Sequence, residues 1–166
     1  MRKLFILCAF LLQLLSPVYP QQATTATIEP NLKYGKPSKE ALSLTSYAPD
    51  TTATAIYLFH QGQSDFIYHD GFQLTTEHWV RIKILKPQGV SYADVSVPYY
   101  SPTDKDEGQE RASEIEGCSY NMENGKCIKT PMKRESISFE RFNNLYKILK
   151  FSLPAVKEGT IIEYHY

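Results

Sequence analysis

The sequence predicts an all-β fold, an antiparallel β-sandwich of about nine strands with one short N-terminal helix. Three observations predict it. Apolar and polar residues alternate along several short segments, tight-turn sequences separate these segments, and helical periodicity is almost absent between them. Short strands at this spacing are typical of antiparallel sandwiches or barrels rather than of parallel βαβ units.

The clearest strand is predicted over residues 72–85, where apolar and polar side chains alternate. The apolar set is Phe72, Leu74, Val80, Ile82 and Ile84, and the polar set is Gln73, Thr75, Glu77, Arg81 and Lys83. A period of two predicts a half-buried strand that directs the first set to a core and the second to water. His78 lies on the apolar row, where a core or rim histidine is a simpler interpretation than a metal ligand.

The remaining strands are predicted between turn sequences. The turns are Gln61-Gly62-Gln63, Asp70-Gly71, Asn124-Gly125 and Asn143-Asn144. The strands are expected at 53–60, 65–69, 92–99, 115–123, 127–134, 137–142, 145–153 and 160–166. The alternation of the last strand is still running at Tyr166, which predicts an open final strand in a module truncated at its C-terminal end.

The first 20 residues are typical of a secretory signal peptide. Arg2 and Lys3 precede an apolar stretch from Leu4 to Leu15, which Ser16-Pro17 ends. The stretch is about half as long as a membrane span requires, so the mature chain is expected to be secreted or periplasmic, without a transmembrane segment. Cys8 lies too early in the apolar stretch to be a lipid-attachment site.

The rest of the chain is predicted to be one module, residues 33–166, behind a flexible lead-in, residues 21–32, that is rich in Thr, Ala and Gln. A two-turn helix is predicted over 37–44, with Ser38 as its N-cap and Glu40 in its first turn. Residues 100–114 lack apolar periodicity, which predicts a long solvated loop.

Charge and cysteine content narrow the possible functions. Without the signal peptide the chain has 16 basic and 18 acidic residues, a net charge of −2, which does not indicate a nucleic-acid-binding surface. A two-residue turn at Asn124-Gly125 places Met122 opposite Cys127 and Cys118 opposite Pro131. The two sulfurs would then lie about 13 Å apart along the strand, too far for a disulfide.

We predict no catalytic, cofactor-binding or metal-ligating residue. Cys118 and Cys127 could serve as nucleophiles, but neither opens a helix that would lower the pKa of its thiol. Two sets of residues are of types that bind metal ions, but their spacing in the sequence matches no known ligand motif. We therefore interpret them as ordinary solvated side chains. They are His60, Asp65, His69 and Asp70, and the loop residues Asp104, Asp106, Glu107 and Glu110.

An interaction surface is the remaining candidate site. Trp79 lies on the polar face of its strand, between Glu77 and Arg81, where an aromatic ring stacks on a sugar or anchors a protein partner. Tyr99 and Tyr100, at the start of the long loop, are grouped with it. The alternative is that Trp79 packs beneath a neighbouring loop or domain.

Five segments resemble a known but uncharacterised module. They are Tyr34–Glu40, Tyr47–Asp50, Gly71–Leu85, Tyr120–Lys126 and Phe151–Tyr164, and together they span nearly all of the mature chain. The chain resembles a domain of unknown function in secreted proteins of Gram-negative bacteria of the Bacteroidetes type. The resemblance implies a position N-terminal to a transglutaminase-like domain with a papain-type Cys, His and Asp set.

The resemblance also implies a function. No catalytic residue is assigned to that module, so the chain is expected to be a non-catalytic accessory module that is not by itself an enzyme. It would position the downstream transglutaminase-like domain in cis, or hold a protein or glycan substrate. The alternatives are a free-standing binding protein for cell-envelope glycan or peptide, and an enzyme built on Cys118 or Cys127.

Overall fold

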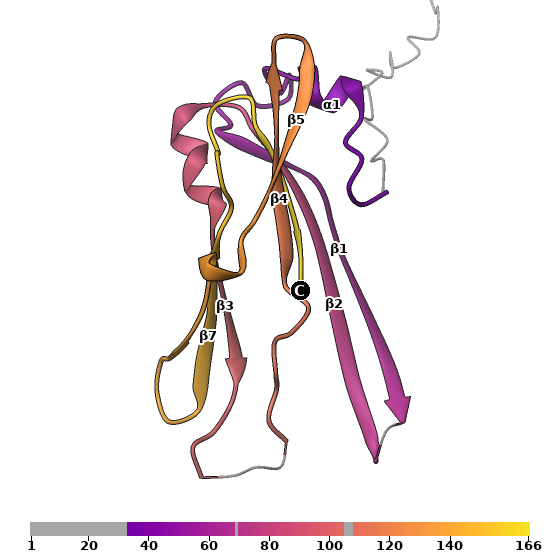
Figure 1. Ribbon diagram of the computed structural model, residues 1–166, viewed down its shortest axis with the longest axis vertical. Helices are drawn as coiled ribbons and strands as arrows, with labels where there is room; N and C mark the ends of the chain where they lie inside the picture. The colour runs from indigo at the N-terminus through magenta and orange to yellow at the C-terminus, as the bar shows by residue number, and fades with distance from the viewer. Residues whose placement is uncertain (1–32, 69, 105–107) are drawn as a thin grey trace, which may run out of the picture.

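The computed structural model describes residues 33–68, 70–104 and 108–166. Two antiparallel sheets form two layers, one of five strands in the order β1-β2-β8-β4-β5 and one of three in the order β3-β7-β6 (Figure 1). The predicted all-β sandwich is therefore confirmed. The predicted signal peptide and lead-in lie outside the described residues, as do His69, Asp106 and Glu107.

The strands are β1 (Ala55–Tyr68), β2 (Phe72–Ile84), β3 (Asp94–Tyr100), β4 (Glu116–Glu123), β5 (Lys126–Pro131), β6 (Ile137–Arg141), β7 (Tyr146–Ser152) and β8 (Ile161–His165). The helices are α1 (Lys39–Ser43) and two 3₁₀ helices, η1 (Pro87–Ala93) and η2 (Arg134–Ser136). Ser38 caps α1 as predicted, because its hydroxyl accepts a hydrogen bond from the Ala41 amide at 3.1 Å.

The main core fills the space between the two sheets. Val80, Ile82 and Ile84 of β2 point into it, as the alternation predicts, and meet Leu149 and Phe151 of β7. A smaller core lies on the other side of the five-stranded sheet, which we call its outer face. There Ala41 of α1 packs against the buried side chains of Cys118, Tyr120 and Ile161.

The β4–β5 hairpin has the predicted register. Asn124 and Gly125 form the turn with φ of 50° and 75°, the left-handed region that a tight two-residue hairpin turn needs. Met122 pairs with Cys127 and Cys118 pairs with Pro131. Both cysteines are free thiols, one buried and one exposed.

The predicted turn at residues 61–63 is wrong. Gly62 lies within a single strand, β1, which pairs with β2 from Ala55 to Tyr68 with one irregularity near Leu58. The two predicted strands at 53–60 and 65–69 are therefore one strand, and the described residues form eight strands in place of nine. A glycine forms a turn only when no neighbouring strand pairs with its backbone. Here β2 pairs with the backbone of Gly62, so the strand continues through it.

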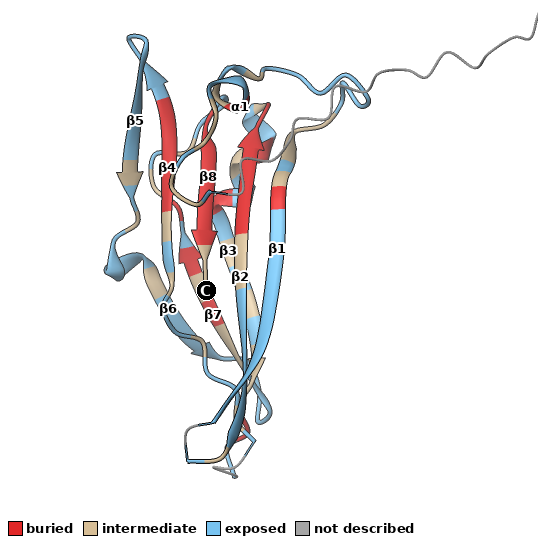
Figure 2. Cartoon of the chain, turned by 90° about the vertical axis from the view of Figure 1, so that its right-hand side faces the viewer, coloured by how far each residue is buried: buried red, intermediate tan, exposed pale blue. Residues whose placement is uncertain are grey.

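The polarity predicted for β2 is partly wrong. Phe72 and Leu74 belong to the apolar row but are 82% and 61% exposed, because the β1–β2 hairpin extends beyond the region where the sheets face each other (Figure 2). In the other half, Arg81 and Lys83 were expected in water but are 2% and 1% exposed. Residues 33–44 cover them from the outer face.

The final strand is not open. β8 lies in the centre of the five-stranded sheet, with β2 on one side and β4 on the other. Ile161, Ile162, Glu163 and Tyr164 are all buried, because the inner face of β8 meets the main core and its outer face meets residues 33–44.

Candidate functional site

A buried cluster of charged and phenolic side chains lies on the outer face of the five-stranded sheet. The Glu163 carboxylate accepts hydrogen bonds from Nε of Arg81 at 3.1 Å and from the Tyr120 hydroxyl at 2.9 Å, and it also bonds Nη2 of Arg81. The backbone amide of Gly35 donates to the same carboxylate at 3.0 Å. The guanidinium of Arg81 lies 4.7 Å from the centre of the Phe59 ring, a cation–π distance.

The N-terminal segment, residues 33–44, completes this cluster with backbone groups. Nη2 of Arg81 donates to the Lys33 carbonyl at 2.8 Å, and Nζ of Lys83 donates to the carbonyls of Leu42 and Gly159 at 2.8 and 2.6 Å. Burial lowers the pKa of Lys83 to about 8. The two hydrogen bonds that Lys83 donates match the two N–H groups of a neutral amine, so a deprotonated Lys83 keeps both.

We assign this cluster a structural role. Glu163 and Arg81 are nearly inaccessible, at 0% and 2% exposure, so no substrate reaches them without removal of the N-terminal segment. Buried charges require partners that replace their water, and the hydrogen bonds above supply those partners.

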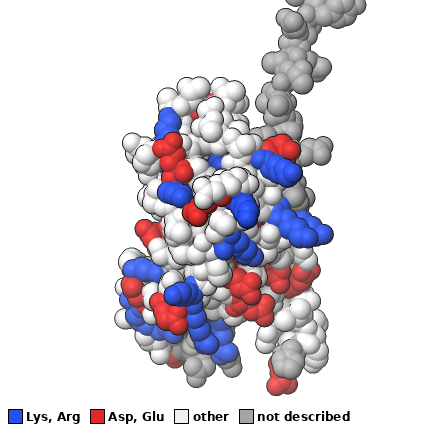
Figure 3. All heavy atoms as spheres, turned by 45° about the horizontal axis from the view of Figure 1, so that its top comes forward, with Lys and Arg blue, Asp and Glu red and all other residues white. Residues whose placement is uncertain are grey.

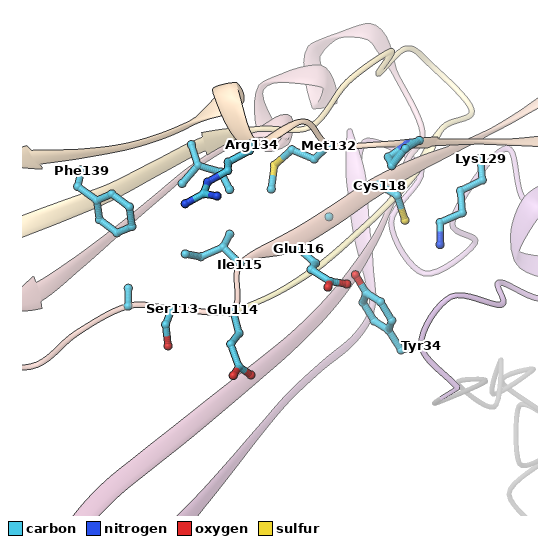
Figure 4. A pocket seen from close by; sticks show the side chains of 14 residues that line it. Tyr34, Ser113, Glu114, Ile115, Glu116, Cys118, Lys129, Met132, Arg134 and Phe139 are labelled. Carbon is cyan, nitrogen blue, oxygen red and sulfur yellow. The ribbon is translucent and has the colours of Figure 1, made fainter.

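An accessible site lies nearby, at the edge of the sandwich. A partly open pocket of about 650 Å³ is lined by residues 112–118 and by the chain that runs from β5 through η2 into β6 (Figure 4). Its apolar wall is formed by Ile115, Met132, Ile137 and Phe139. Its polar end carries Tyr34, Glu116, Cys118 and Lys129 (Figure 4).

Within the described part of the chain, some of the charged side chains around the pocket have interaction partners and others do not. Glu116 lies 3.4 Å from Nε2 of His165, and Lys129 lies over the Tyr120 ring at 5.8 Å. The guanidinium of Arg134, in contrast, has no hydrogen bond or ion pair with the described residues. Glu114, on the opposite wall, has a φ of 54°, an uncommon conformation for a residue other than glycine. An unpaired cation beside an apolar wall suits a ligand that carries both an apolar group and a negative charge.

Cys118 lacks the surroundings of a nucleophile. Burial raises the pKa of its thiol, which favours the unreactive protonated form. Within the described residues no hydrogen bond joins Cys118 to a histidine, and no group of three or more His, Cys, Asp and Glu side chains is arranged to hold a metal ion. Cys127 is exposed on β5.

The three aromatic residues predicted as an interaction surface do not come together. Trp79 is half-buried on the outer face of the five-stranded sheet, where it pairs with Gln61 and His165. Tyr99 packs against the main core from β3. Tyr100 points the other way, and its ring meets that of Tyr146 with centres 5.8 Å apart.

The sequence pattern did not indicate the pocket, although one of its lining residues, Cys118, was considered as a nucleophile. The walls come from segments about 20 residues apart that the β4–β5 hairpin brings together, and the spacing of Ile115, Met132, Arg134 and Phe139 matches no motif. The sequence carries one sign of this site: the alternation of apolar and polar residues is interrupted at Lys133-Arg134-Glu135, next to the pocket, where the structure has η2.

A smaller groove of about 300 Å³ lies between β1 and β3. Tyr57 and Tyr92, 53% and 39% exposed, line it together with the polar side chains of Ser91, Asp94 and Ser96. The two tyrosine rings meet at 81° with centres 6.1 Å apart. Exposed aromatic rings beside hydroxyl and carboxylate groups suit a polar ligand with apolar faces.

Comparison with protein-family models, with curated proteins and with solved structures finds no match to this chain. None of the helices in the described part of the chain has the length and apolarity needed to cross a bilayer.

Replacing Glu163 by Gln is expected to lower the free energy of unfolding by about 3 kcal/mol or more, because it leaves the buried Arg81 guanidinium without its counter-charge. The matched control is Glu140→Gln, which breaks the exposed Glu140–Lys150 pair and is expected to cost less than about 1 kcal/mol. Urea titration monitored by circular dichroism measures both. Equal costs for the two variants would contradict the structural role of the cluster.

Lys83 is expected to make stability rise between pH 8 and pH 10. The pKa of Lys83 is about 8 in the folded chain and about 10.4 in an unfolded one, so in this window the unfolded chain holds a proton that the folded chain has released. The free energy of unfolding then rises by at most about 1.4 kcal/mol per pH unit. Above pH 10 the trend reverses, because burial raises the pKa of Tyr34 and Tyr164 and only their unfolded forms ionise.

Urea titrations at intervals from pH 7 to pH 11 test this profile. Lys83→Met is expected to remove the rise, and the control Lys86→Met, at a lysine that binds the exposed carbonyls of Thr51 and Thr52, is expected to retain it. A rise of the same size in Lys83→Met would assign the effect to another group.

Proposed function

We propose that residues 33–166 form a non-catalytic interaction module that holds its ligand in the pocket between residues 112–118 and β6. The observation that carries this proposal is the Arg134 guanidinium, which has no ion pair or hydrogen bond with the described residues and lies beside four apolar side chains of one cavity. Binding sites combine a largely apolar lining with a few polar groups that orient the ligand. This pocket has that composition.

The surroundings of Cys118 support a binding role over a catalytic one. Nucleophilic catalysis needs a thiolate and an adjacent base, whereas burial raises the pKa of this thiol. The positive charge nearest to the pocket belongs to Lys129 and Arg134, which cannot accept a proton from a thiol in their charged forms. We therefore assign recognition, and no bond making, to the module.

The wider context of the proposal comes from the sequence. The five segments that resemble the module found before transglutaminase-like domains support a role in a secreted or periplasmic protein, in which the pocket serves a catalytic domain that follows in the chain. In that role it positions the transglutaminase-like domain or holds the substrate on which that domain acts.

The dye 1-anilinonaphthalene-8-sulfonate tests the pocket, because it joins two aromatic groups, naphthalene and phenyl, to one negative charge. The chain offers an internal control in its methionines, since Met132 lines the pocket and Met122 is 47% exposed on β4. In protein labelled with methyl-¹³C methionine, the dye is expected to shift the Met132 methyl resonance and to leave that of Met122 in place.

Two phenylalanine variants complete this test. Phe139→Ala is expected to weaken binding at the Met132 site about tenfold, and Phe142→Ala, which removes an equally large exposed ring outside the pocket, is expected to leave it unchanged. A Met132 resonance that does not respond to the dye would count against the pocket as a ligand site.

Glycan binding in the groove between β1 and β3 is a second candidate function. The specific observation is the pair of exposed tyrosines, Tyr57 and Tyr92, beside three hydroxyl or carboxylate side chains. Such rings pack against the apolar face of a sugar while the polar groups bind its hydroxyls. This function supports the alternative of a cell-envelope glycan-binding protein.

Titration with soluble peptidoglycan fragments tests the second candidate. Tyr92→Ala is expected to weaken binding about tenfold, whereas Tyr47→Ala, at a tyrosine that is 38% exposed outside the groove, is expected to have no effect. Equal binding by wild type and Tyr92→Ala would exclude the groove as the glycan site.

A further inference from the structure

The β6 strand is an edge of the three-stranded sheet. Among the described residues its sheet neighbour is β7, which pairs with it from Ile137 to Arg141, so one side of β6 has no strand beside it. An edge strand presents a row of backbone donors and acceptors to which an extended peptide can add.

The other three edge strands carry features that oppose strand addition. β1 has an irregularity near Leu58, β3 contains Pro98, and β5 carries Lys126 and Lys129 and ends at Pro131. Bulges, prolines and lysines are the devices by which proteins protect exposed edges. β6, with the sequence Ile-Ser-Phe-Glu-Arg, contains no proline and no lysine, and its pairing with β7 is regular.

The edge of β6 and the pocket are continuous. Ile137 and Phe139 are alternate residues of β6, and both line the pocket. A strand that pairs with β6 would direct every second side chain to the same side as these two, because side chains alternate along a strand. Those side chains would enter the pocket, where Ile115 and Met132 supply apolar contacts.

The charge of the residues around β6 indicates that the peptide is acidic. Residues 126–150, which contain β5, η2, β6 and most of β7, include seven Lys and Arg against two Asp and Glu, whereas residues 33–125 include eight against thirteen. Figure 3 shows basic side chains gathered, with a few acidic ones, at the end of the molecule where the three-stranded sheet lies. Arg134, at the pocket itself, has no partner among the described residues.

We propose that β6 and the adjoining pocket bind an extended acidic peptide, which adds as a fourth strand to the three-stranded sheet and places an apolar side chain in the pocket. This inference rests on the proposed function, because it names the class of ligand for the same pocket. Main-chain hydrogen bonds with β6 hold the peptide, the pocket selects the apolar residue, and the basic region attracts the acidic residues around it.

The probe is a fluorescein-labelled peptide, acetylated and amidated, in which glutamates alternate with threonines around one central leucine. Fluorescence anisotropy is expected to give saturable binding that weakens with added salt. A peptide with lysines in place of the glutamates is expected to bind about tenfold more weakly or worse. Phe139→Ala is expected to weaken binding of the acidic peptide about tenfold, and the control Phe142→Ala is expected to retain it.

Two N-methylated peptides test strand addition itself. A strand presents successive backbone amides to opposite sides, so methylating one alternate set blocks the hydrogen bonds with β6 and methylating the other set leaves them intact. One peptide is expected to lose binding and the other to keep it. In hydrogen exchange measured by NMR, the acidic peptide is also expected to slow exchange of alternate β6 amides.

The outcomes separate this inference from the proposed function. If the sulfonate dye shifts Met132 but the acidic peptide does not bind, the peptide is the wrong ligand and the pocket remains a ligand site. If both N-methylated peptides bind equally, the peptide does not add to β6. If neither dye nor peptide binds, both proposals fail.

Discussion

The buried ion pair between Arg81 and Glu163 is the constraint on which the rest of the structure depends. Both charges lie at the centre of the five-stranded sheet, and removing such groups from water costs several kcal/mol each unless other groups replace that water. The sheet itself supplies the Tyr120 hydroxyl, the Phe59 ring and the cross-strand ion pair. The N-terminal segment adds two further partners, the carbonyl of Lys33 and the amide of Gly35. The charges on β2 and β8 therefore determine where residues 33–44 lie.

This arrangement explains the unusual distribution of burial in the sheet. Because the N-terminal segment covers one face and the three-stranded sheet covers the other, β8 and half of β2 are buried on both sides (Figure 2). The N-terminal segment contacts Arg81 and Lys83 but extends no further along the hairpin, and the other half of β1–β2 is exposed. A single five-residue helix with its flanking turns is thus sufficient to create a second core.

The sequence predicts most of the strands because alternating apolar and polar residues indicate a strand with one buried face. It predicts the hairpin at Asn124-Gly125 because the turn type depends on two adjacent residues, and the observed register agrees at every pair from Cys118 to Lys126. It does not predict that Arg81 and Lys83 are buried, because alternation identifies a polar face but not what covers it. The covering segment bonds these residues from 41 and 48 positions away in the sequence, and it leaves no local pattern beside them. The adjacent apolar residues Ile161 and Ile162 were the available sign of burial on both faces.

The pocket also could not be predicted from the sequence, because it too depends on contacts between distant segments. Its walls meet only after β4, β5 and β6 are placed in two different sheets, and no short-range pattern encodes the space left where the sheets separate. Gln61-Gly62-Gln63 illustrates the opposite error, in which a local turn signal is overridden by long-range pairing with β2. A short sequence pattern predicts the backbone conformation correctly where nearby residues form the hydrogen bonds, as at Ser38. It fails where pairing with a distant strand determines the conformation.

Tyr34 connects the constraint to the candidate function. It belongs to the N-terminal segment, its ring packs on His165 of β8 with centres 5.0 Å apart, and it lines the pocket beside Glu116 and Cys118 (Figure 4). A ligand that touches Tyr34 binds the form of the chain in which the segment is docked, and so it stabilises that form in proportion to its concentration and affinity. The hydrogen bond that the Gly35 amide donates to Glu163 holds Tyr34 in place from the adjacent residue. The buried ion pair therefore shapes the pocket although no ligand touches it, and a loss of the pair would weaken binding through the position of Tyr34.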